Sequence, residues 1–171
     1  MKQISLVIHV LIMLTLVGCI YSTNSVADNL SLPVRLLYEG AHGGGHISNP
    51  NAYRITTEDQ LQKIYNQFGK LTFGAVKRQV PRVDFSREEV LLVAMGQKPT
   101  TGYQLQLHRS KINISGDTAV LSLAWIEPPP GAILPQVITS PCILIALPIG
   151  NYSRIYILDQ KEQKRLEVSI R

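Results

Sequence analysis

Cysteine and tryptophan are scarce in this sequence, which has two cysteines and one tryptophan in 171 residues. Two cysteines cannot form the framework of several disulfides that holds many small secreted domains together. A basic stripe is also missing, because the lysines and arginines are dispersed except in the segment Lys161 to Arg165. Nucleic-acid-binding proteins normally carry such a stripe. We therefore expect no nucleic-acid partner. We attribute the formal net charge of +5 to basic side chains on a solvated face of the protein.

The apolar run from Ile4 to Val17 is too short to span a bilayer comfortably and has about the length of a signal-peptide core. A single basic residue, Lys2, precedes it. The run ends in Leu16-Val17-Gly18-Cys19, which matches the bacterial lipobox. We expect residues 1–18 to be a lipoprotein signal peptide and the sulfur of Cys19 to carry a diacylglycerol with palmitate-type chains. Such a lipid anchors a protein to the membrane without a spanning segment.

The residue after the lipidated cysteine bears on localisation. Ile20 occupies this position, where an aspartate usually retains Gram-negative lipoproteins at the inner membrane. We therefore expect the protein in the cell envelope, at the outer membrane and facing the periplasm. Residues 19–31 are polar and suit a tether, and residues 32–171 have the length of a single domain with a hydrophobic core.

One amphipathic helix is expected in the mature chain. Thr57-Glu58-Asp59-Gln60 is a capping box with acidic residues in the first helical turn. Gly69 ends the helical pattern. The apolar residues that follow the capping box recur with helical spacing and form one face: Leu61, Ile64, Tyr65 and Phe68.

The rest of the domain has the pattern of β-strands. Apolar alternation, or a short apolar run, predicts strands in the following segments: 32–39, 51–56, 90–95, 103–107, 112–114, 119–126, 142–147, 155–158 and 166–170. Ser115-Gly116-Asp117 is a hairpin turn signal. We expect an α+β fold, mainly an antiparallel β-sandwich or barrel with the amphipathic helix packed on it.

The six consecutive apolar residues from Val90 to Met95 are typical of a buried central strand. A turn of sequence Gly-Gln-Lys-Pro-Thr-Thr-Gly-Tyr follows. Pro99 fixes its own φ angle and disfavours helix at Lys98, and Gly102 can adopt a positive φ. A stiff polar loop at the end of a core strand is a candidate recognition edge.

This part of the chain resembles a known family. The run from Pro81 to Tyr103, PRVDFSREEVLLVAMGQKPTTGY, resembles the C-terminal domain of the protease complex subunit PrcB family. That family shows Val-Asp-Phe, a hydrophobic strand and a Gly-x-Lys-Pro-Thr-Gly-Gly-Tyr-like turn. Thr101 departs from this pattern, which usually has a second glycine there. Segments Glu127 to Gly131 and Gln136 to Pro141 fit the family's proline-glycine loop and the Thr-x-Pro before its next strand. The resemblance covers Gly40 to Pro148.

The resemblance implies a small secreted or envelope protein that associates with a protease, and no known chemistry. We therefore expect a non-enzymatic, membrane-anchored interaction subunit. Its partner is expected to be a protein, with a protease as the candidate class. The expected partner-binding residues lie in two loops, with the glycine-rich segment near Gly43 as a third candidate: Lys98, Pro99, Thr100, Thr101, Gly102, Tyr103, Pro129, Pro130 and Gly131.

An inhibitor is the alternative. Pro99 to Tyr103 is similar to the Asn-Pro-Thr-Thr-Gly-Tyr loop of chagasin-type cysteine protease inhibitors, which are small β-sandwiches. In that family the loop enters the protease cleft beside a glycine-rich loop and an Arg-Pro-aromatic loop. Thr101 fits this pattern. However, Lys98 replaces the asparagine, Gly43 to Gly45 precede the loop, and the Arg-Pro-aromatic sequence is absent.

The sequence suggests neither a catalytic nor a metal site, and no cofactor. His42-Gly43-Gly44-Gly45 matches an esterase oxyanion-hole motif, but the required Gly-x-Ser-x-Gly elbow is absent. His42 and His46 are four residues apart, but the glycines between them oppose a helix, and no nearby carboxylate completes a zinc site. Ser140, His108 and Asp117 are the residue types of a catalytic triad, but nothing in the sequence indicates that they form one.

Two further residues have a structural and a functional interpretation. Cys142 lies in a strand-like apolar run, where a cysteine usually packs as a small hydrophobic residue and is not a nucleophile. Trp125 lies in mid-strand, where tryptophan is more often a core residue than an exposed interface anchor. We expect both side chains in the core.

Overall fold

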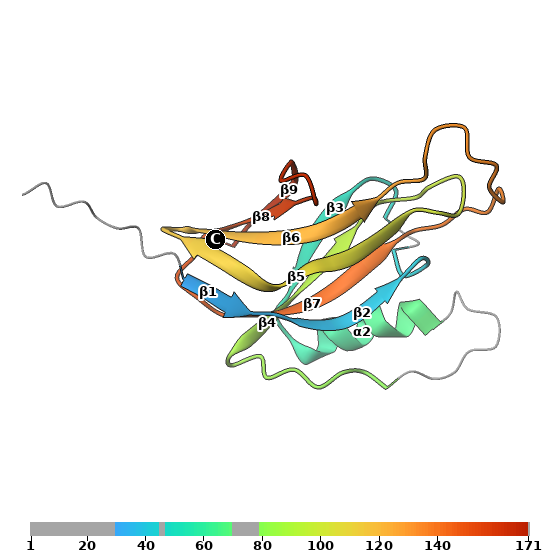
Figure 1. Cartoon of the computed structure of the whole chain (residues 1–171). Helices are drawn as coiled ribbons and strands as arrows, with labels where there is room; N and C mark the ends of the chain where they lie inside the picture. Colours follow the sequence, from blue (N-terminus) through green and yellow to red (C-terminus); the bar gives the residue numbers. More distant parts are fainter. Residues whose placement is uncertain (1–29, 45–46, 70–78, 171) are drawn as a thin grey trace, which may run out of the picture.

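The computed structural model describes residues 30–44, 47–69 and 79–170 (Figure 1). The predicted signal peptide, Cys19 and residues 20–29 of the predicted tether lie outside this described part, as do Gly45 and His46. None of the helices in the described ranges has the length and apolar character needed to cross a membrane.

The strands form two separate sheets, so the sandwich alternative is confirmed and the closed barrel is not. The five-stranded sheet contains, in spatial order, β1 (Leu30–Pro33), β5 (Gln104–Ser115), β6 (Thr118–Ile126), β8 (Arg154–Leu158) and β9 (Lys164–Ser169). The four-stranded sheet contains β2 (Arg35–Gly40), β7 (Cys142–Pro148), β4 (Glu88–Ala94) and β3 (Asn51–Ile55). Neighbouring strands are antiparallel, except that β6 and β8 are parallel.

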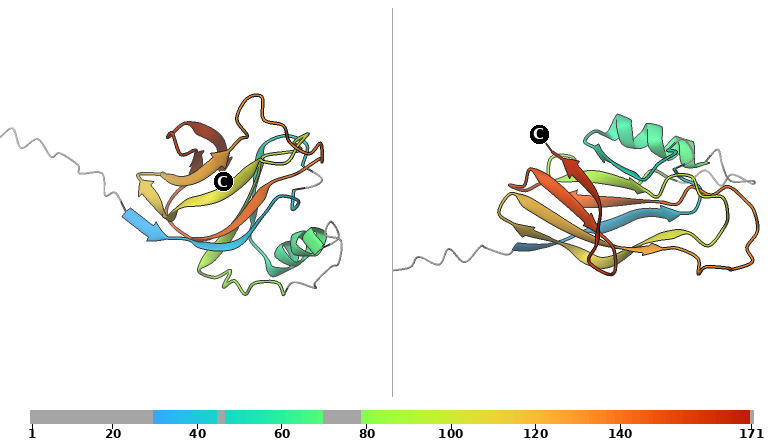
Figure 2. Two further views of the ribbon diagram at one scale, coloured as in Figure 1. Left: turned by 45° about the vertical axis from the view of Figure 1, so that its right-hand side comes forward. Right: turned by 90° about the horizontal axis from the view of Figure 1, so that it is seen from above.

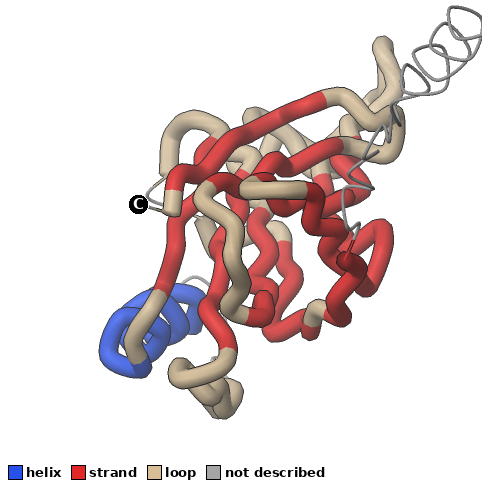
Figure 3. The backbone as a smooth tube through the Cα atoms, turned by 90° about the vertical axis from the view of Figure 1, so that its left-hand side faces the viewer, coloured by secondary structure: helices blue, strands red, loops and turns tan. Residues whose placement is uncertain are grey.

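The molecule has three layers, because helix α2 (Glu58–Gly69) covers the outer face of the four-stranded sheet (Figures 2 and 3). Strand β4 is therefore buried on both faces, which explains its continuous apolar sequence. Leu91 and Val93 belong to the core between the two sheets. Val90 and Leu92 belong to the second core, under the helix. The prediction of a buried central strand is confirmed.

The helix begins where the capping box predicts. The Gln60 N–H donates to Thr57 Oγ1 at 3.3 Å, and Gln60 Oε1 accepts from the Thr56 N–H at 3.0 Å. Leu61, Tyr65 and Phe68 are buried, and Ile64 is partly buried. The predicted apolar face is confirmed as the face that packs on the sheet.

The prediction of one strand over residues 32–39 is wrong. The structure has two strands there, β1 and β2, which belong to different sheets. Val34 lies between them, and its N–H donates to the Ser110 carbonyl in β5 at 3.0 Å. Apolar alternation continues through the junction, so the local pattern carries no sign of the change of sheet.

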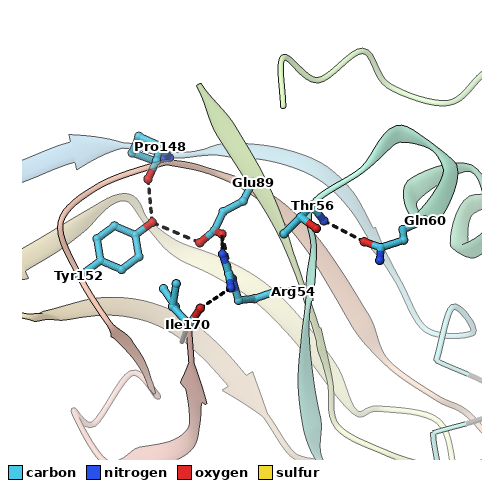
Figure 4. Close-up of polar contacts among 7 residues, drawn as sticks. All are labelled: Arg54, Thr56, Gln60, Glu89, Pro148, Tyr152 and Ile170. Atoms are coloured by element: carbon cyan, nitrogen blue, oxygen red, sulfur yellow. Dashed lines mark hydrogen bonds and ion pairs between the residues drawn. The ribbon is translucent and has the colours of Figure 1, made fainter. Parts of the chain in front are cut away.

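A partly buried polar network joins the two sheets near the end of the chain (Figure 4). Arg54 of β3 donates through Nε to Glu89 Oε2 at 2.9 Å and also pairs with it through Nη2. Arg54 Nη1 donates to the Ile170 carbonyl, just after β9, at 2.8 Å. The Tyr152 hydroxyl donates to the Pro148 carbonyl at 2.7 Å and lies 3.4 Å from Glu89 Oε1. Burial and the Glu89 charge raise the pKa of Tyr152.

Candidate functional site

Three connecting segments meet at one end of the sandwich, which we call the loop end: residues 41–44, 95–103 and 127–141. They follow or precede the adjacent strands β2, β4 and β7. The register places Gly40 opposite Cys142, and Cys142 opposite Ala94. The segments that continue from these three positions therefore become neighbours as well, although they lie far apart in the sequence.

The segment before β7 lies between the other two and is hydrogen-bonded to both. On one side, the Ser140 N–H donates to the Ala41 carbonyl at 2.7 Å, and the Gly44 N–H donates to the Ser140 carbonyl at 3.1 Å. On the other side, Lys98 and Thr139 exchange two backbone hydrogen bonds of 2.8 and 2.9 Å. The glycine-rich segment and the Lys98–Tyr103 loop are thus fixed relative to each other.

The Lys98–Tyr103 loop is held by further contacts with residues 127–141. Thr139 Oγ1 donates to the Thr100 carbonyl at 2.9 Å, and the Thr101 N–H donates to the Pro135 carbonyl at 3.3 Å. Gly102 has a φ of +94°, which residues other than glycine rarely adopt. The Lys98 ammonium lies 5.3 Å from the centroid of the Tyr103 ring, a cation–π contact.

The proline-rich segment makes a defined turn. The Ala132 N–H donates to the Pro129 carbonyl at 3.2 Å, and Gly131 has a φ of +78°. Proline at the second position and a positive-φ glycine at the third are the features of a type II β-turn. Pro129, Pro130 and Gly131 therefore form the tip of a shaped loop.

The most exposed apolar residues of the loop end are not among the residues predicted from the sequence. Ile133, Val137 and Ile138 are 101%, 50% and 69% exposed. They lie within residues 127–141, which form no named strand and project beyond the ends of the sheets (orange in Figure 1). The length of this connection was an available signal, because long connections inside compact domains are often functional. Three exposed apolar side chains in one connecting segment make that segment a candidate interaction surface.

Two cavities open at the loop end. One, of about 440 Å³, lies against Thr100, Tyr103 and the loop from Pro128 to Leu134. The other, of about 240 Å³, lies between residues 39–42 and residues 101–105. Tyr103 lines both cavities. Most of the predicted partner-binding residues therefore line one of two cavities that share Tyr103, whereas Lys98 and Pro99 line neither.

Cys142 and Trp125 are core residues, as predicted. Cys142 is fully buried, and burial raises the pKa of its thiol to about 12, although the Gly43 N–H donates to the sulfur and opposes the rise. A thiol of this kind is protonated at neutral pH and is a poor nucleophile. Trp125 is 4% exposed and packs between the sheets.

The structure does not bring Ser140, His108 and Asp117 together as a catalytic triad. Ser140 lies at the loop end, whereas Asp117 lies in the β5–β6 turn, where it binds Ser153 and Arg154. The nine residues of β6 separate the two ends, which is about 30 Å of strand. Within the described residues, no three histidine, cysteine, aspartate or glutamate side chains form a group that could hold a metal ion. His42 is exposed at the rim of the smaller cavity.

Part of the chain is similar to a known protein family. Residues 90–148 match the family model described as PrcB C-terminal. This segment runs from β4 through β7 and contains both the Lys98–Tyr103 loop and residues 127–141. Neither the curated proteins nor the solved structures gave a match. The resemblance expected from the sequence is confirmed over this segment.

Proposed function

Because residues 90–148 carry a PrcB C-terminal segment, we propose that the protein is a non-enzymatic interaction subunit, anchored to the membrane by lipid on Cys19, that associates with a protease or protease complex. The observation that carries the proposal is the loop end. There, the exposed side chains of Ile133, Val137 and Ile138 stand on a hydrogen-bonded frame within the matched segment.

The energetics favour protein docking at this surface. Full burial of one isoleucine or valine side chain is favourable by about 1.5–3 kcal/mol before the costs of association are subtracted. Two prolines, Pro129 and Pro130, and the backbone bonds of Thr139 restrict the loop before binding. A loop that is already ordered loses less conformational entropy when a partner covers it.

The location of Leu30, the first described residue, supports a protein that is anchored to the membrane at one end and exposes the loop end at the other. Leu30 pairs with Ile114 near the β5–β6 turn, at the end of the sandwich opposite the loop end (Figure 1). The nine residues of β6 span the distance between the two ends, which corresponds to about 30 Å. An anchor that precedes Leu30 leaves the loop end free to face away from the membrane.

The test is crosslinking and capture of the full-length lipoprotein from its own cell envelope, followed by identification of the captured proteins. We expect a protease or a protease-complex component. A variant that combines Ile133→Ser, Val137→Ser and Ile138→Ser should recover at least ~10-fold less of this partner, because a loss of about 1.4 kcal/mol is a factor of ten in affinity.

The matched control replaces exposed apolar residues at the opposite end, Leu30→Ser and Ile149→Ser, which are 51% and 54% exposed. The control protein should recover the partner as the natural protein does. The proposal fails if no stable partner is captured after crosslinking, or if the two variants recover it equally.

A chagasin-like inhibitor is the second candidate, and one observation favours it. Segment 139–141 joins the glycine-rich segment and the Pro99–Tyr103 loop side by side at the loop end, as an inhibitor that uses several loops would require. Titration into papain separates the two functions. Inhibition at micromolar concentration that is lost on Gly102→Glu, in a variant with an unchanged melting temperature, supports the inhibitor. Complex formation without inhibition supports the subunit, and unchanged papain activity removes the inhibitor.

A further inference from the structure

Glu39 places a carboxylate on the core-facing side of strand β2. Its neighbour Tyr38 faces the helix, where its ring stacks on Phe68 with centroids 4.4 Å apart. Successive side chains of a strand point to opposite faces, so Glu39 points toward the five-stranded sheet. Its register partner Ile143 is fully buried in the core between the sheets. Glu39 itself is exposed, because the space between the sheets opens at this end.

That opening is the cavity of about 240 Å³. Its described lining is the following: Glu39, Gly40, Ala41, His42, Thr101, Gly102, Tyr103, Gln104, Leu105 and Thr139. Leu105 is buried and provides an apolar base. The described lining contains no lysine or arginine. Lys98 lies over the Tyr103 ring and is not part of the wall. Glu39 also forms none of the ion pairs found in the described part of the chain.

We propose that this cavity receives a lysine or arginine side chain of the protein partner and that Glu39 is its counter-charge. The source of the side chain rests on the proposed function, whereas the preference for a cation rests on the cavity alone. The volume is below the range of about 300–1,000 Å³ that is typical of drug-sized ligands, so it suits one side chain. The apolar base matches the methylene stem of a basic residue, and a carboxylate pairs with its charged end.

A purely structural role for Glu39 makes a different prediction. An inward-pointing charge on an edge strand can prevent pairing between sheets of different molecules, and β2 is the edge of its sheet. That role needs the negative charge but no cavity, so it predicts only a nonsaturable attraction of cations. Saturable binding of the charged probe, with shifts confined to the cavity wall, therefore distinguishes recognition from protection of the edge.

The probe is N-acetyl-arginine methylamide, and its control is the citrulline compound, which has nearly the same shape but no charge. Both are titrated into the ¹⁵N-labelled full-length chain in nonionic detergent, and amide shifts are followed. We expect millimolar binding of the arginine probe that moves the resonances of Gly40, Ala41 and Gly102. The citrulline probe should bind about 5-fold more weakly, as loss of an ion pair of about 1 kcal/mol, the upper end for exposed pairs, predicts.

Two variants complete the test. Glu39→Gln should bind the two probes equally, whereas Glu127→Gln, which changes a nearby carboxylate outside the cavity, should keep the preference. Equal binding of both probes by the natural protein, or no shift at about 50 mM probe, overturns the proposal. Capture of the partner through Ile133, Val137 and Ile138 is scored separately. A protein that captures its partner but ignores the arginine probe loses only this inference.

Discussion

At the scale of single residues, Cys142 shows how the loop end is joined to the core. It is the first residue of β7, it pairs with both β2 and β4, and the Gly43 N–H points at its sulfur. Its thiol is therefore part of the packing that fixes the glycine-rich segment. The raised pKa makes this burial measurable as a dependence of stability on pH.

We predict that Cys142 makes the protein less stable in alkali. Its pKa is about 12 in the folded state, against an ordinary value of 9.0, so its contribution is complete below pH 9.0 and is lost as the pH rises toward the folded pKa. Between these values the loss approaches about 1.4 kcal/mol per pH unit. Urea unfolding at a series of pH values, under reducing conditions, measures it.

Cys142→Ala is the comparison for this prediction. The substitution should cost about 1 kcal/mol at pH 8 because it leaves a small cavity, but it should remove the thiol's share of the alkaline slope. Tyr152, whose pKa is also raised, contributes in both proteins and cancels in the difference. Parallel stability curves for the two proteins would contradict the assignment.

At the scale of elements, Arg54 connects strands that belong to different sheets. It lies in β3, pairs with the buried Glu89 of β4 and donates to the carbonyl that follows β9. Arg35 of β2 forms a similar pair with Glu88, at 2.7 Å, but its side chain is 48% exposed. The two arginines pair with consecutive glutamates and differ mainly in burial.

We predict that Arg54→Met lowers the free energy of unfolding by about 3–5 kcal/mol, because Glu89 is left as a buried, unpaired charge. Arg35→Met should cost less than about 1 kcal/mol, since solvent screens an exposed pair. Adding Glu89→Leu to Arg54→Met should restore much of the loss. Chemical denaturation at neutral pH gives all three values, and equal effects of the two arginine substitutions would refute the distinction.

At the scale of the whole molecule, the length of the sandwich separates Leu30, the first described residue, from the loop end. Leu30 lies near the β5–β6 turn, and residues 127–141 lie at the other end of the sheets (Figure 1). The ten residues between the proposed lipidated Cys19 and Leu30 reach at most about 35 Å. The length of the sandwich is therefore comparable with the reach of the anchor.

We predict that the turn end lies nearer the lipid than the loop end does when the lipidated protein is bound to vesicles. Ser115→Cys and Ala132→Cys replace exposed residues at the two ends, and the buried Cys142 should not react with a dye. Energy transfer to a headgroup acceptor should be stronger from position 115. Equal transfer from both positions would exclude an outward-facing loop end.

The sequence by itself determined the elements whose cause is local. The continuous apolar run of β4 predicted its burial, and the capping box at Thr57 predicted the start of the helix. Pro99 and Gly102 predicted the turn that follows β4, and the motif around Lys98 to Tyr103 identified the family segment. Each of these follows from backbone preference or periodicity within a few residues.

Only the tertiary structure decided how distant segments combine. It split the strand at Val34 between two sheets, placed residues 139–141 between the two other loops, and exposed Ile133 and Ile138. It also turned Glu39 toward an open cavity. These outcomes depend on which strands pair and in which register, and strand pairing joins residues as far apart in the sequence as Arg35 and Ala146. A local pattern specifies the face of a strand, but the pairing of the strands specifies what that face meets.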